Sequence, residues 1–208
     1  MKKQTQEANT MKNIIPLFIT IFLFGCSSCG PTELETPEDT QEEEVLPFEW
    51  ATWETCSQVE GDHPCNFTLH DQNGDEVSLY DFHDSPIILD LSAMWCGPCQ
   101  MAASDLQNTV DKYADDDLRY ITVLIDNPSG LPPAQSDLED WANIYGISEP
   151  VLGGNRDMID YSAQAGWNLT SWPTFVGITS DMKVHLILQG FSTSLIEYLA
   201  DETIAASQ

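Results

Sequence analysis

The chain has 208 residues, and its 34 Asp and Glu residues against 7 Lys and Arg residues give a formal net charge of −27. This charge excludes nucleic-acid binding and charge-driven binding to anionic membranes, because phosphate groups would be repelled. Hydrophobic residues make up 42% of the chain, which is enough for a packed core, and the length suits one domain of about 150 residues preceded by a tail.

The N-terminus carries an apolar run that is typical of an export signal. Residues 14–25 follow Lys12, and this run is too short to span a bilayer, which needs roughly 20 residues. It ends at residues 23–26 (Leu-Phe-Gly-Cys), which resemble the lipobox of bacterial lipoproteins, where the cysteine is lipidated and begins the mature chain. We expect a lipoprotein-type signal peptide over residues 1–25 with Cys26 lipidated; a plain signal peptide is the alternative.

Residues 26–47 predict an acidic, disordered tether. Segment 30–44 is rich in Glu and contains Pro but no aromatic residue, so it cannot bury enough surface to offset its ordering entropy. We expect the tether to hold a folded domain, residues 48–208, away from a membrane on the periplasmic side of the cell envelope. Ser27, rather than Asp, follows the predicted lipidation site and favours the outer membrane.

The first predicted elements of the domain are a hairpin and a βαβ unit. An Asn-Gly pair between the short alternating runs 67–70 and 77–79 predicts the hairpin. The continuous apolar run at 86–91 indicates a buried strand, a helix is expected from Cys96, and residues 120–125 predict a second buried strand. A strand, a helix and a strand in this order predict a parallel strand pair.

The second half of the domain predicts helices, a hairpin and a closing helix. A capping box at Ser136–Glu139 and a stop at Gly146 predict one helix, and a further helical stretch is expected at 157–165. Residues 174–188 predict an antiparallel hairpin, and a second capping box at Ser194–Glu197 predicts the start of the last helix.

The candidate chemistry lies in the tetrapeptide Cys96-Gly97-Pro98-Cys99, which follows a buried strand and opens a helix. Unpaired N–H groups and the helix dipole stabilise a thiolate there, so the pKa of Cys96 is expected below the value of about 8.5 of a free thiol. The spacing lets Cys99 resolve a mixed disulfide. Two alternatives are a buried structural disulfide and a zinc ribbon, although a ribbon needs a second pair of ligands at suitable spacing.

Other cysteines and the histidines give no second chemical site. Cys56 and Cys65 are expected to form a structural disulfide, which an oxidising exterior permits; a redox relay to the tetrapeptide is the alternative. Cys29 is left over. The four histidines are scattered singly, so we expect no metal and no cofactor beyond the redox-active Cys96–Cys99 pair.

The tetrapeptide and its surroundings resemble the thioredoxin-like superfamily, and within it the redoxin subgroup of TlpA-like and peroxiredoxin-related proteins. Residues 95–99 (Trp-Cys-Gly-Pro-Cys) match the thioredoxin motif, Asp90 stands where thioredoxins have a buried acid, and residues 172–174 (Trp-Pro-Thr) match the cis-proline segment. The resemblance covers roughly residues 60–205. It implies an α/β thioredoxin fold, a central mixed β-sheet flanked by helices, with an N-terminal β-hairpin and a helical insert.

The resemblance also implies a role for each site residue. Cys96 is the attacking nucleophile, Cys99 is the resolving thiol, and Asp90 is a buried carboxylate that exchanges a proton with Cys99. Pro173 is expected to be cis and to bring the backbone of Trp172 beside the disulfide, where it pairs with a substrate peptide. The residues expected to contact substrate are Trp95, Gly97, Pro98 and Trp172.

Two departures from the family pattern are visible. Thioredoxins carry a lysine on the strand after the motif helix, near the buried acid, and the corresponding stretch at 121–124 has none. A peroxiredoxin would need a Thr two or three residues before its reactive cysteine, and residues 92–95 lack it, which disfavours peroxidase activity.

The sequence therefore predicts an exported, lipid-anchored thiol–disulfide oxidoreductase. The Gly-Pro pair between the cysteines is that of reducing thioredoxins, so we expect it to reduce protein disulfides with electrons from a membrane donor. A disulfide oxidase or isomerase and a non-catalytic binding module that presents Trp95 and Trp172 are the alternatives. A copper chaperone-like role would need a Met or His partner at a sensible spacing to the cysteines, which is missing.

Overall fold

The computed structural model describes residues 55–208. The predicted signal peptide (1–25), the tether (26–47), the lipidation site Cys26 and the first residues of the predicted domain lie outside the described residues. Within residues 55–208, no helix has both the length and the apolar character needed to cross a bilayer.

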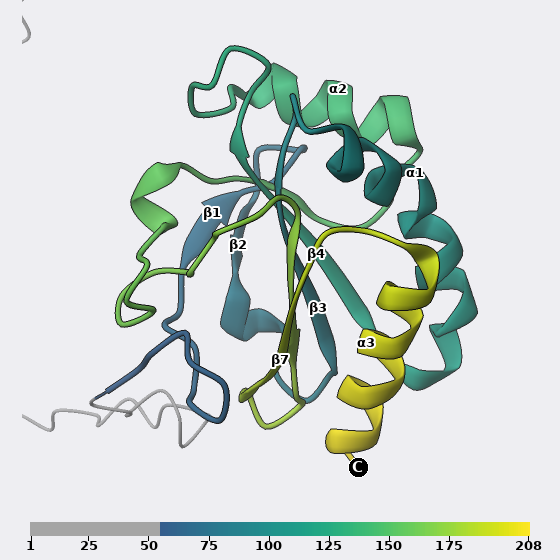
Figure 1. Ribbon diagram of the computed structural model, residues 1–208. Coiled ribbons are helices and arrows are strands. Elements are labelled where there is room, and N and C mark those ends of the chain that lie inside the picture. Colours follow the sequence, from purple (N-terminus) through teal and green to yellow (C-terminus); the bar gives the residue numbers. More distant parts are fainter. Residues whose placement is uncertain (1–54) are drawn as a thin grey trace, which may run out of the picture. The chain divides into compact units, whose positions relative to one another are not determined.

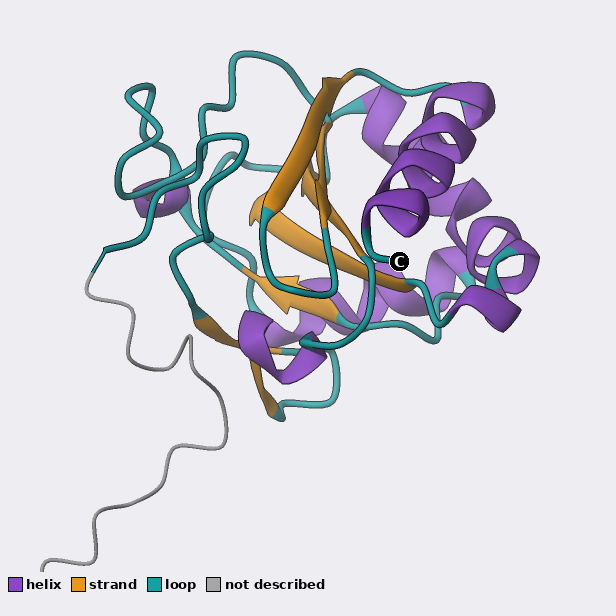
Figure 2. Ribbon diagram, turned by 90° about the horizontal axis from the view of Figure 1, so that it is seen from below, coloured by secondary structure: helices purple, strands orange, loops and turns teal. Residues whose placement is uncertain are grey.

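A five-stranded mixed sheet with the strand order β5-β4-β3-β6-β7 forms the centre of this part of the chain (Figure 1). Strand β3 (Ile87–Ala93) runs parallel to β4 (Arg119–Asp126) and antiparallel to β6 (Thr174–Ile178). Strand β5 (Val151–Gly153) extends the parallel half, and β7 (Val184–Gln189) pairs with β6. Figure 2 shows the twist of the strands from below. This arrangement confirms the predicted α/β thioredoxin fold.

Three α-helices cover one face of the sheet, as Figure 1 shows: α1 (Gly97–Lys112), α2 (Gln135–Tyr145) and α3 (Thr193–Ala206). Their apolar side chains form one buried cluster with alternate residues of β3, β4 and β6. The hairpin of β1 (Thr68–His70) and β2 (Glu76–Ser78), which the sequence predicted, packs with the long segment before β6 on the opposite face. The site is thus built on a sheet with both faces covered.

Strand β3 owes its central place to its side chains. All seven of its residues are buried. Ile88 joins the cluster beneath the helices, whereas Ile87, Leu89 and Leu91 join the cluster on the opposite face, as the alternation of a strand requires. A strand buried on both faces needs a continuous apolar run, so its charged residue, Asp90, stands out.

Both predicted capping boxes are wrong in position. Helix α2 starts after Ala134, whose backbone N–H is bonded by the Asp137 carboxylate at 2.7 Å, rather than at Ser136–Glu139. Helix α3 starts after Ser192, whose hydroxyl accepts a backbone N–H of the first turn, rather than at Ser194–Glu197. A cap lies where the chain leaves helical geometry, and Ala134 and Ser192 are the extended residues here, with ψ of 164° and 149°.

The predicted helix at 157–165 is also wrong. The Asp160 carboxylate accepts the backbone N–H groups of Ser162 at 2.9 Å and Ala165 at 3.1 Å, and this local bonding competes with a helix. The insert contains the strand β5 as well, which was not predicted because three residues are too few to show a period. Single turns of 3-10 helix lie at Leu79–Phe82 (η2), Ala114–Asp116 (η3) and Arg156–Met158 (η4).

Candidate functional site

The Cys-Gly-Pro-Cys tetrapeptide forms the N-terminal end of α1. Cys96 is the N-cap residue, and its Sγ accepts a hydrogen bond from the backbone N–H of Cys99 at 3.2 Å. Pro98 stands in the first turn, where the lack of an N–H costs nothing. Cys96 and Cys99 are joined as a disulfide. After reduction, the unpaired N–H groups and the positive end of the helix dipole can stabilise a thiolate at Cys96.

In the tetrapeptide, the two middle residues are exposed to solvent and the two cysteines are buried. Cys99 is fully buried and Cys96 is 5% exposed, whereas Gly97 and Pro98 are exposed. A Cβ placed on Gly97 would meet no atom within 4 Å, so the surface above the tetrapeptide is open to a partner. Of the two cysteines, Cys96 is the one that a partner's sulfur can approach from this surface.

Two tryptophans stand beside the disulfide. Trp172 packs against the small cluster of Ala93, Cys96 and Cys99, and Trp95 is 46% exposed. Their ring centroids are 5.9 Å apart in an edge-to-face arrangement, which is a favoured geometry for aromatic pairs. The two rings form an apolar rim next to Cys96.

The loop before β6 brings a proline to the same place. The Trp172–Pro173 peptide bond is cis, and the Pro173 carbonyl accepts the backbone N–H of Gly190 at 2.9 Å, which ties this loop to the end of β7. Among the described residues, neither the backbone N–H nor the carbonyl of Trp172 has a hydrogen-bond partner. These two groups are therefore available to an extended peptide.

Asp90 lies beneath α1 in the middle of the sheet. It is 1% exposed, and its Oδ1 accepts a hydrogen bond from the Ser92 hydroxyl at 2.5 Å. Burial raises the pKa of Asp90 to about 7, and the bond from Ser92 opposes this rise with a smaller effect. A carboxyl group with a pKa near neutrality can take up and release a proton under physiological conditions.

Two residues that the sequence reasoning missed hold the exposed tryptophan. Asp126 ends β4 and is 1% exposed, and its carboxylate accepts the indole N–H of Trp95 at 3.2 Å. The same carboxylate accepts two hydrogen bonds from Arg156 of η4, at 3.0 and 2.5 Å, and these bonds raise the pKa of Arg156. The sequence signal for Asp126 was an acid at the end of a buried strand; nothing local pointed to its partner 30 residues later.

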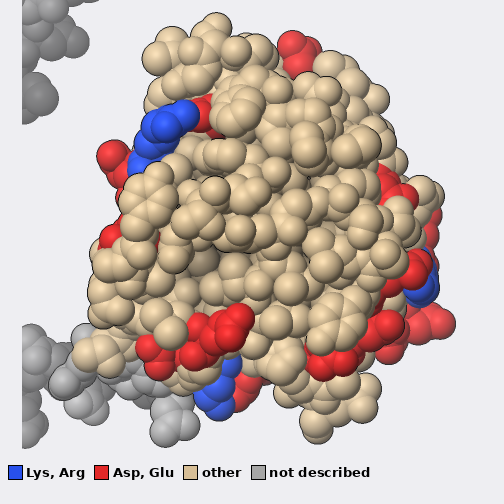
Figure 3. Space-filling view, in the orientation of Figure 1, with Lys and Arg blue, Asp and Glu red and all other residues tan. Residues whose placement is uncertain are grey.

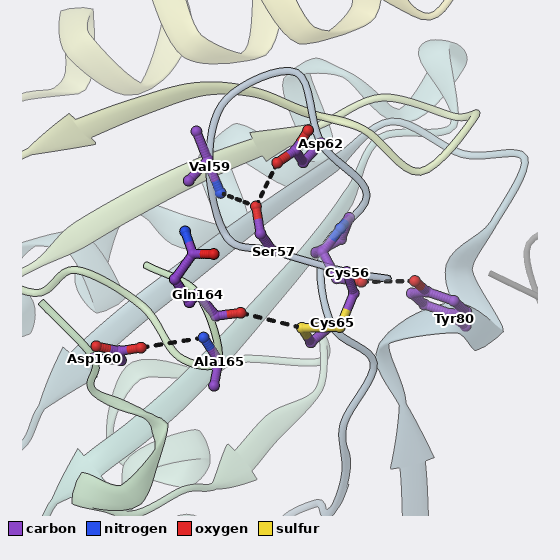
Figure 4. The surroundings of a disulfide bond; sticks show 10 residues. Cys56, Ser57, Val59, Asp62, Cys65, Tyr80, Asp160, Gln164 and Ala165 are labelled. Atoms are coloured by element: carbon purple, nitrogen blue, oxygen red, sulfur yellow. Dashed lines mark hydrogen bonds between the residues drawn. A yellow bond between two sulfur atoms is a disulfide. The ribbon is translucent and has the colours of Figure 1, made fainter. Parts of the chain in front are cut away.

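The second cysteine pair, Cys56 and Cys65, is also a disulfide in the structure (Figure 4). The Cys65 sulfur lies 3.9 Å from the Gln164 carbonyl, the Gln58 backbone N–H donates to the Ala163 carbonyl at 2.9 Å, and further bonds lead to η2. These contacts join the disulfide loop to the segment after η4.

The loop that this disulfide closes covers part of the free edge of β7. The Gly61 N–H donates to the Val184 carbonyl at 2.7 Å, and the Val184 N–H donates to the Asp62 carbonyl at 2.9 Å. Further along, the Ile187 N–H donates to the Glu60 carboxylate at 3.1 Å. Covering an edge strand in this way removes a surface that would otherwise pair with another chain.

Residues 55–208 contain no group of three His, Cys, Asp or Glu side chains placed to hold a metal ion. Two of the histidines instead bond backbone carbonyls through Nδ1, His63 to Met182 at 2.7 Å and His83 to Tyr80 at 2.9 Å.

Comparison with known proteins agrees with this geometry. The chain is 24% identical over 130 residues to the thioredoxin-like protein YneN of Bacillus subtilis (strain 168), covering 60% of this chain and 71% of that protein. It is 23% identical over 135 residues to the thiol-disulfide oxidoreductase ResA of the same strain, covering 64% and 69%. A crystal structure described as a thiol:disulfide interchange protein DsbE from Chlorobium tepidum superposes with a TM-score of 0.57 at 25% identity, covering 73% of this chain and 100% of that chain.

A family model settles the relationship. The model described as the AhpC/TSA family matches residues 61–186, which is more than half of the chain. The matched segment contains the cysteine tetrapeptide, the buried acid and the cis-proline loop. The chain therefore belongs to the AhpC/TSA family, and it is a thioredoxin-like redoxin of the thiol–disulfide oxidoreductase type.

Proposed function

We propose that this protein is an exported, lipid-anchored enzyme that reduces protein disulfides with the dithiol of Cys96 and Cys99. One observation carries the proposal: Cys96 caps α1 at a surface open to a partner, and Cys99 is fully buried directly behind it. The more accessible Cys96 sulfur is therefore suited to attack a substrate disulfide, and the buried Cys99 sulfur is suited to resolve the mixed disulfide.

The first half of the reaction forms a mixed disulfide. The Cys96 thiolate, stabilised by the N-terminal N–H groups of α1, attacks one sulfur of a substrate disulfide. A bond forms between Cys96 and that sulfur while the substrate S–S bond breaks. The other substrate sulfur leaves as a thiolate and takes up a proton from solvent.

The second half releases the reduced substrate. Asp90, as a base with a pKa of about 7, takes the proton of the Cys99 thiol. The Cys99 thiolate attacks the Cys96 sulfur, the Cys96–Cys99 disulfide closes and the second substrate sulfur leaves as a thiolate. The substrate has gained two electrons, and the enzyme has reached the oxidised state of the structure. A membrane-bound electron donor then returns two electrons.

The loop before β6 supplies the substrate site in this proposal. An extended peptide pairs with the free backbone groups of Trp172, and its apolar side chains rest on the rim of Trp95 and Trp172. Gly97 and Pro98 form the open floor beside it. Such a site recognises backbone and apolar surface, which suits partially unfolded protein substrates.

Export and anchoring rest on the N-terminal sequence. The apolar run 14–25 and Cys26 support lipidation and a place on the periplasmic side of the envelope, at the outer membrane. The full chain is expected to incorporate a clickable fatty acid in growing bacteria, and Cys26→Ser is expected to lose it. Label retained in Cys26→Ser would contradict anchoring at this residue.

The direction of electron flow is tested by the reduction potential of the Cys96–Cys99 pair, equilibrated against thiol buffers. We expect a value near the roughly −270 mV of thioredoxin. A value near the roughly −120 mV of a strong oxidant would move the protein to disulfide formation and overturn the proposed direction.

Catalysis is tested by trapping. Cys99→Ser cannot resolve a mixed disulfide, so it is expected to accumulate covalent adducts with envelope proteins that a reductant releases. Cys96→Ser paired with Cys99→Ser is the control and forms none. If Cys99→Ser also traps nothing, the fold serves as a non-catalytic binding module.

A further inference from the structure

The buried acid has hydroxyl neighbours where thioredoxins have a cation. Thr122 lies directly opposite Asp90 in the register of β3 and β4, and it is 1% exposed. All cationic side chains of residues 55–208 lie at the surface in ion pairs with other carboxylates. These side chains are Lys112, Arg119, Arg156 and Lys183.

The first hydroxyl already bonds the acid. Ser92 is fully buried and stands two residues after Asp90 on β3, so both side chains point to the same face of the sheet. Its Oγ donates to the Asp90 Oδ1 at 2.5 Å. Because both partners are buried, bulk water does not weaken this bond, and it lowers the pKa of Asp90 against the larger effect of burial.

The second hydroxyl is unused. The Thr122 Oγ1 is buried and, among the described residues, has no hydrogen-bond partner. A buried hydroxyl without a partner is costly, and most are paired. Residues opposite each other on paired strands share a face, so the Thr122 side chain stands on the same face of the sheet as the Asp90 carboxylate.

We propose that Ser92 and Thr122 are positioning residues that stabilise the ionised form of Asp90. Ser92 keeps its hydrogen bond in both protonation states but holds the charged carboxylate more strongly, and Thr122 donates once the carboxylate is charged. Two neutral donors thereby replace the missing lysine. The consequence for Cys99 rests on the proposed function, because it needs Asp90 to act as a base. The effect on Asp90 itself does not.

Other groups facing Asp90 leave its titration readable. Tyr120 on β4 is buried, and burial together with the charges of Asp90 and Asp105 raises its pKa well above the ordinary value, so it stays neutral. From α1, Asp105 acts on Tyr120 through its charge, and Cys99 does not titrate while it is in the disulfide. On β6, the residue opposite Asp90 is the apolar Phe175.

The test is a carbon-13 NMR titration of the Asp90 carboxyl in the oxidised protein, with the signal assigned by its loss in Asp90→Asn. Ser92→Ala is expected to raise the pKa of Asp90 by about one pH unit, since bonds to charged groups are the stronger ones. Thr122→Val is expected to raise the pKa of Asp90 by less than Ser92→Ala does. The double variant is expected to raise it by more than either single variant.

Two controls separate positioning from packing. Thr122→Ser keeps the hydroxyl and is expected to titrate like the parent protein. Thr203→Val removes a buried hydroxyl of α3 that bonds the Leu199 carbonyl at 2.7 Å, and it is expected to leave Asp90 unchanged. If Ser92→Ala does not fold, Thr122→Val alone carries the test.

Each outcome is decisive. An unchanged Asp90 titration in Ser92→Ala or in Thr122→Val overturns the assignment of that residue. The rate of mixed-disulfide release, measured as a function of pH, connects the titration of Asp90 to function. In Ser92→Ala the acid limb of this pH profile is expected to shift to higher pH together with the pKa of Asp90. If the pKa of Asp90 rises in Ser92→Ala but the acid limb of the pH profile does not shift, the positioning role stands and Asp90 is not the base for Cys99.

Discussion

At the scale of single residues, the buried Asp90 carboxyl lowers the stability of the folded protein when it is ionised. Burial raises its pKa from 3.8 to about 7. Between these two values the folded protein holds a proton that the unfolded chain has released, so the free energy of unfolding falls as the pH rises through this interval. Below the interval both states are protonated and the penalty is absent. The fold thus gives up stability at neutral pH to keep an ionisable carboxyl group in its core.

Asp90→Asn is expected to raise the free energy of unfolding of the oxidised protein at pH 8 by up to about 4 kcal/mol, because the neutral amide carries no desolvated charge. Near pH 4 the gain is expected to vanish. Urea unfolding at the two pH values measures the difference. The same variant is expected to release mixed disulfides more slowly.

The matched control is Asp160→Asn. Asp160 is a partly exposed acid whose pKa is lowered to about 2, chiefly by hydrogen bonds from Ser162. Its amide variant is expected to lose stability at pH 8, the opposite sign. A gain from Asp90→Asn that is equal at both pH values would show that packing, not charge, is responsible.

At the scale of elements, α2 begins with an unfilled cap. Ala134 is extended at the N-cap position but has no side-chain oxygen for the N–H groups of the first turn. Ala134→Ser is expected to raise the free energy of unfolding by about 0.5–1 kcal/mol, measured by urea titration. Ala134→Val adds bulk without an acceptor and is expected to show no such gain; equal gains in both variants would exclude capping as the cause.

The loop that the Cys56–Cys65 disulfide closes is hydrogen-bonded to the edge of β7. Replacing both cysteines by Ala is expected to lower the free energy of unfolding by about 2–3 kcal/mol, the value for closing a loop of this length. Because the loop covers the edge, the backbone amides of Val184 and Ile187 are expected to exchange with solvent faster.

The comparison for this prediction is the protein with Cys96 and Cys99 both replaced by Ala. It lacks the other disulfide and is expected to keep slow exchange at the β7 edge. Reductase activity is expected to survive loss of the first pair and to disappear with loss of the second. If activity disappears with the first pair, that disulfide serves as a redox relay.

At the scale of the whole molecule, charge is the dominant property. The chain carries −27, and Figure 3 shows the acidic side chains of one face gathered mainly around its margin, with an uncharged centre. A field of this sign repels acidic partners over a distance that shrinks from roughly 30 Å at 0.01 M salt to about 8 Å at 0.15 M.

Reduction of an acidic disulfide peptide is therefore expected to accelerate several-fold between these two salt concentrations, and reduction of a basic peptide of equal length to slow down. Stopped-flow rates on both peptides measure this, with a neutral peptide as the reference. The same salt response for all three peptides would mean that the field does not reach the site.

The sequence by itself determined the elements whose signals are local. The Asn-Gly pair placed the first hairpin, the apolar runs placed β3 and β4, and the tetrapeptide at 96–99 marked the start of α1. Asp90 was marked by the resemblance of its position to that of the buried acid in thioredoxins. These signals depend on a residue and its close neighbours along the chain, so they are present before folding.

The tertiary structure alone decided the rest. It joined Trp95, Asp126 and Arg156, set Thr122 beside Asp90, and turned the expected helix after η4 into an irregular segment. The first two features depend on side chains from distant parts of the chain that meet only in the folded protein, whereas the irregular segment follows from the backbone N–H groups that bond the Asp160 carboxylate. The Asp90 carboxyl gains its raised pKa and its neighbour Thr122 from the packing around it, which no local pattern of residues specifies.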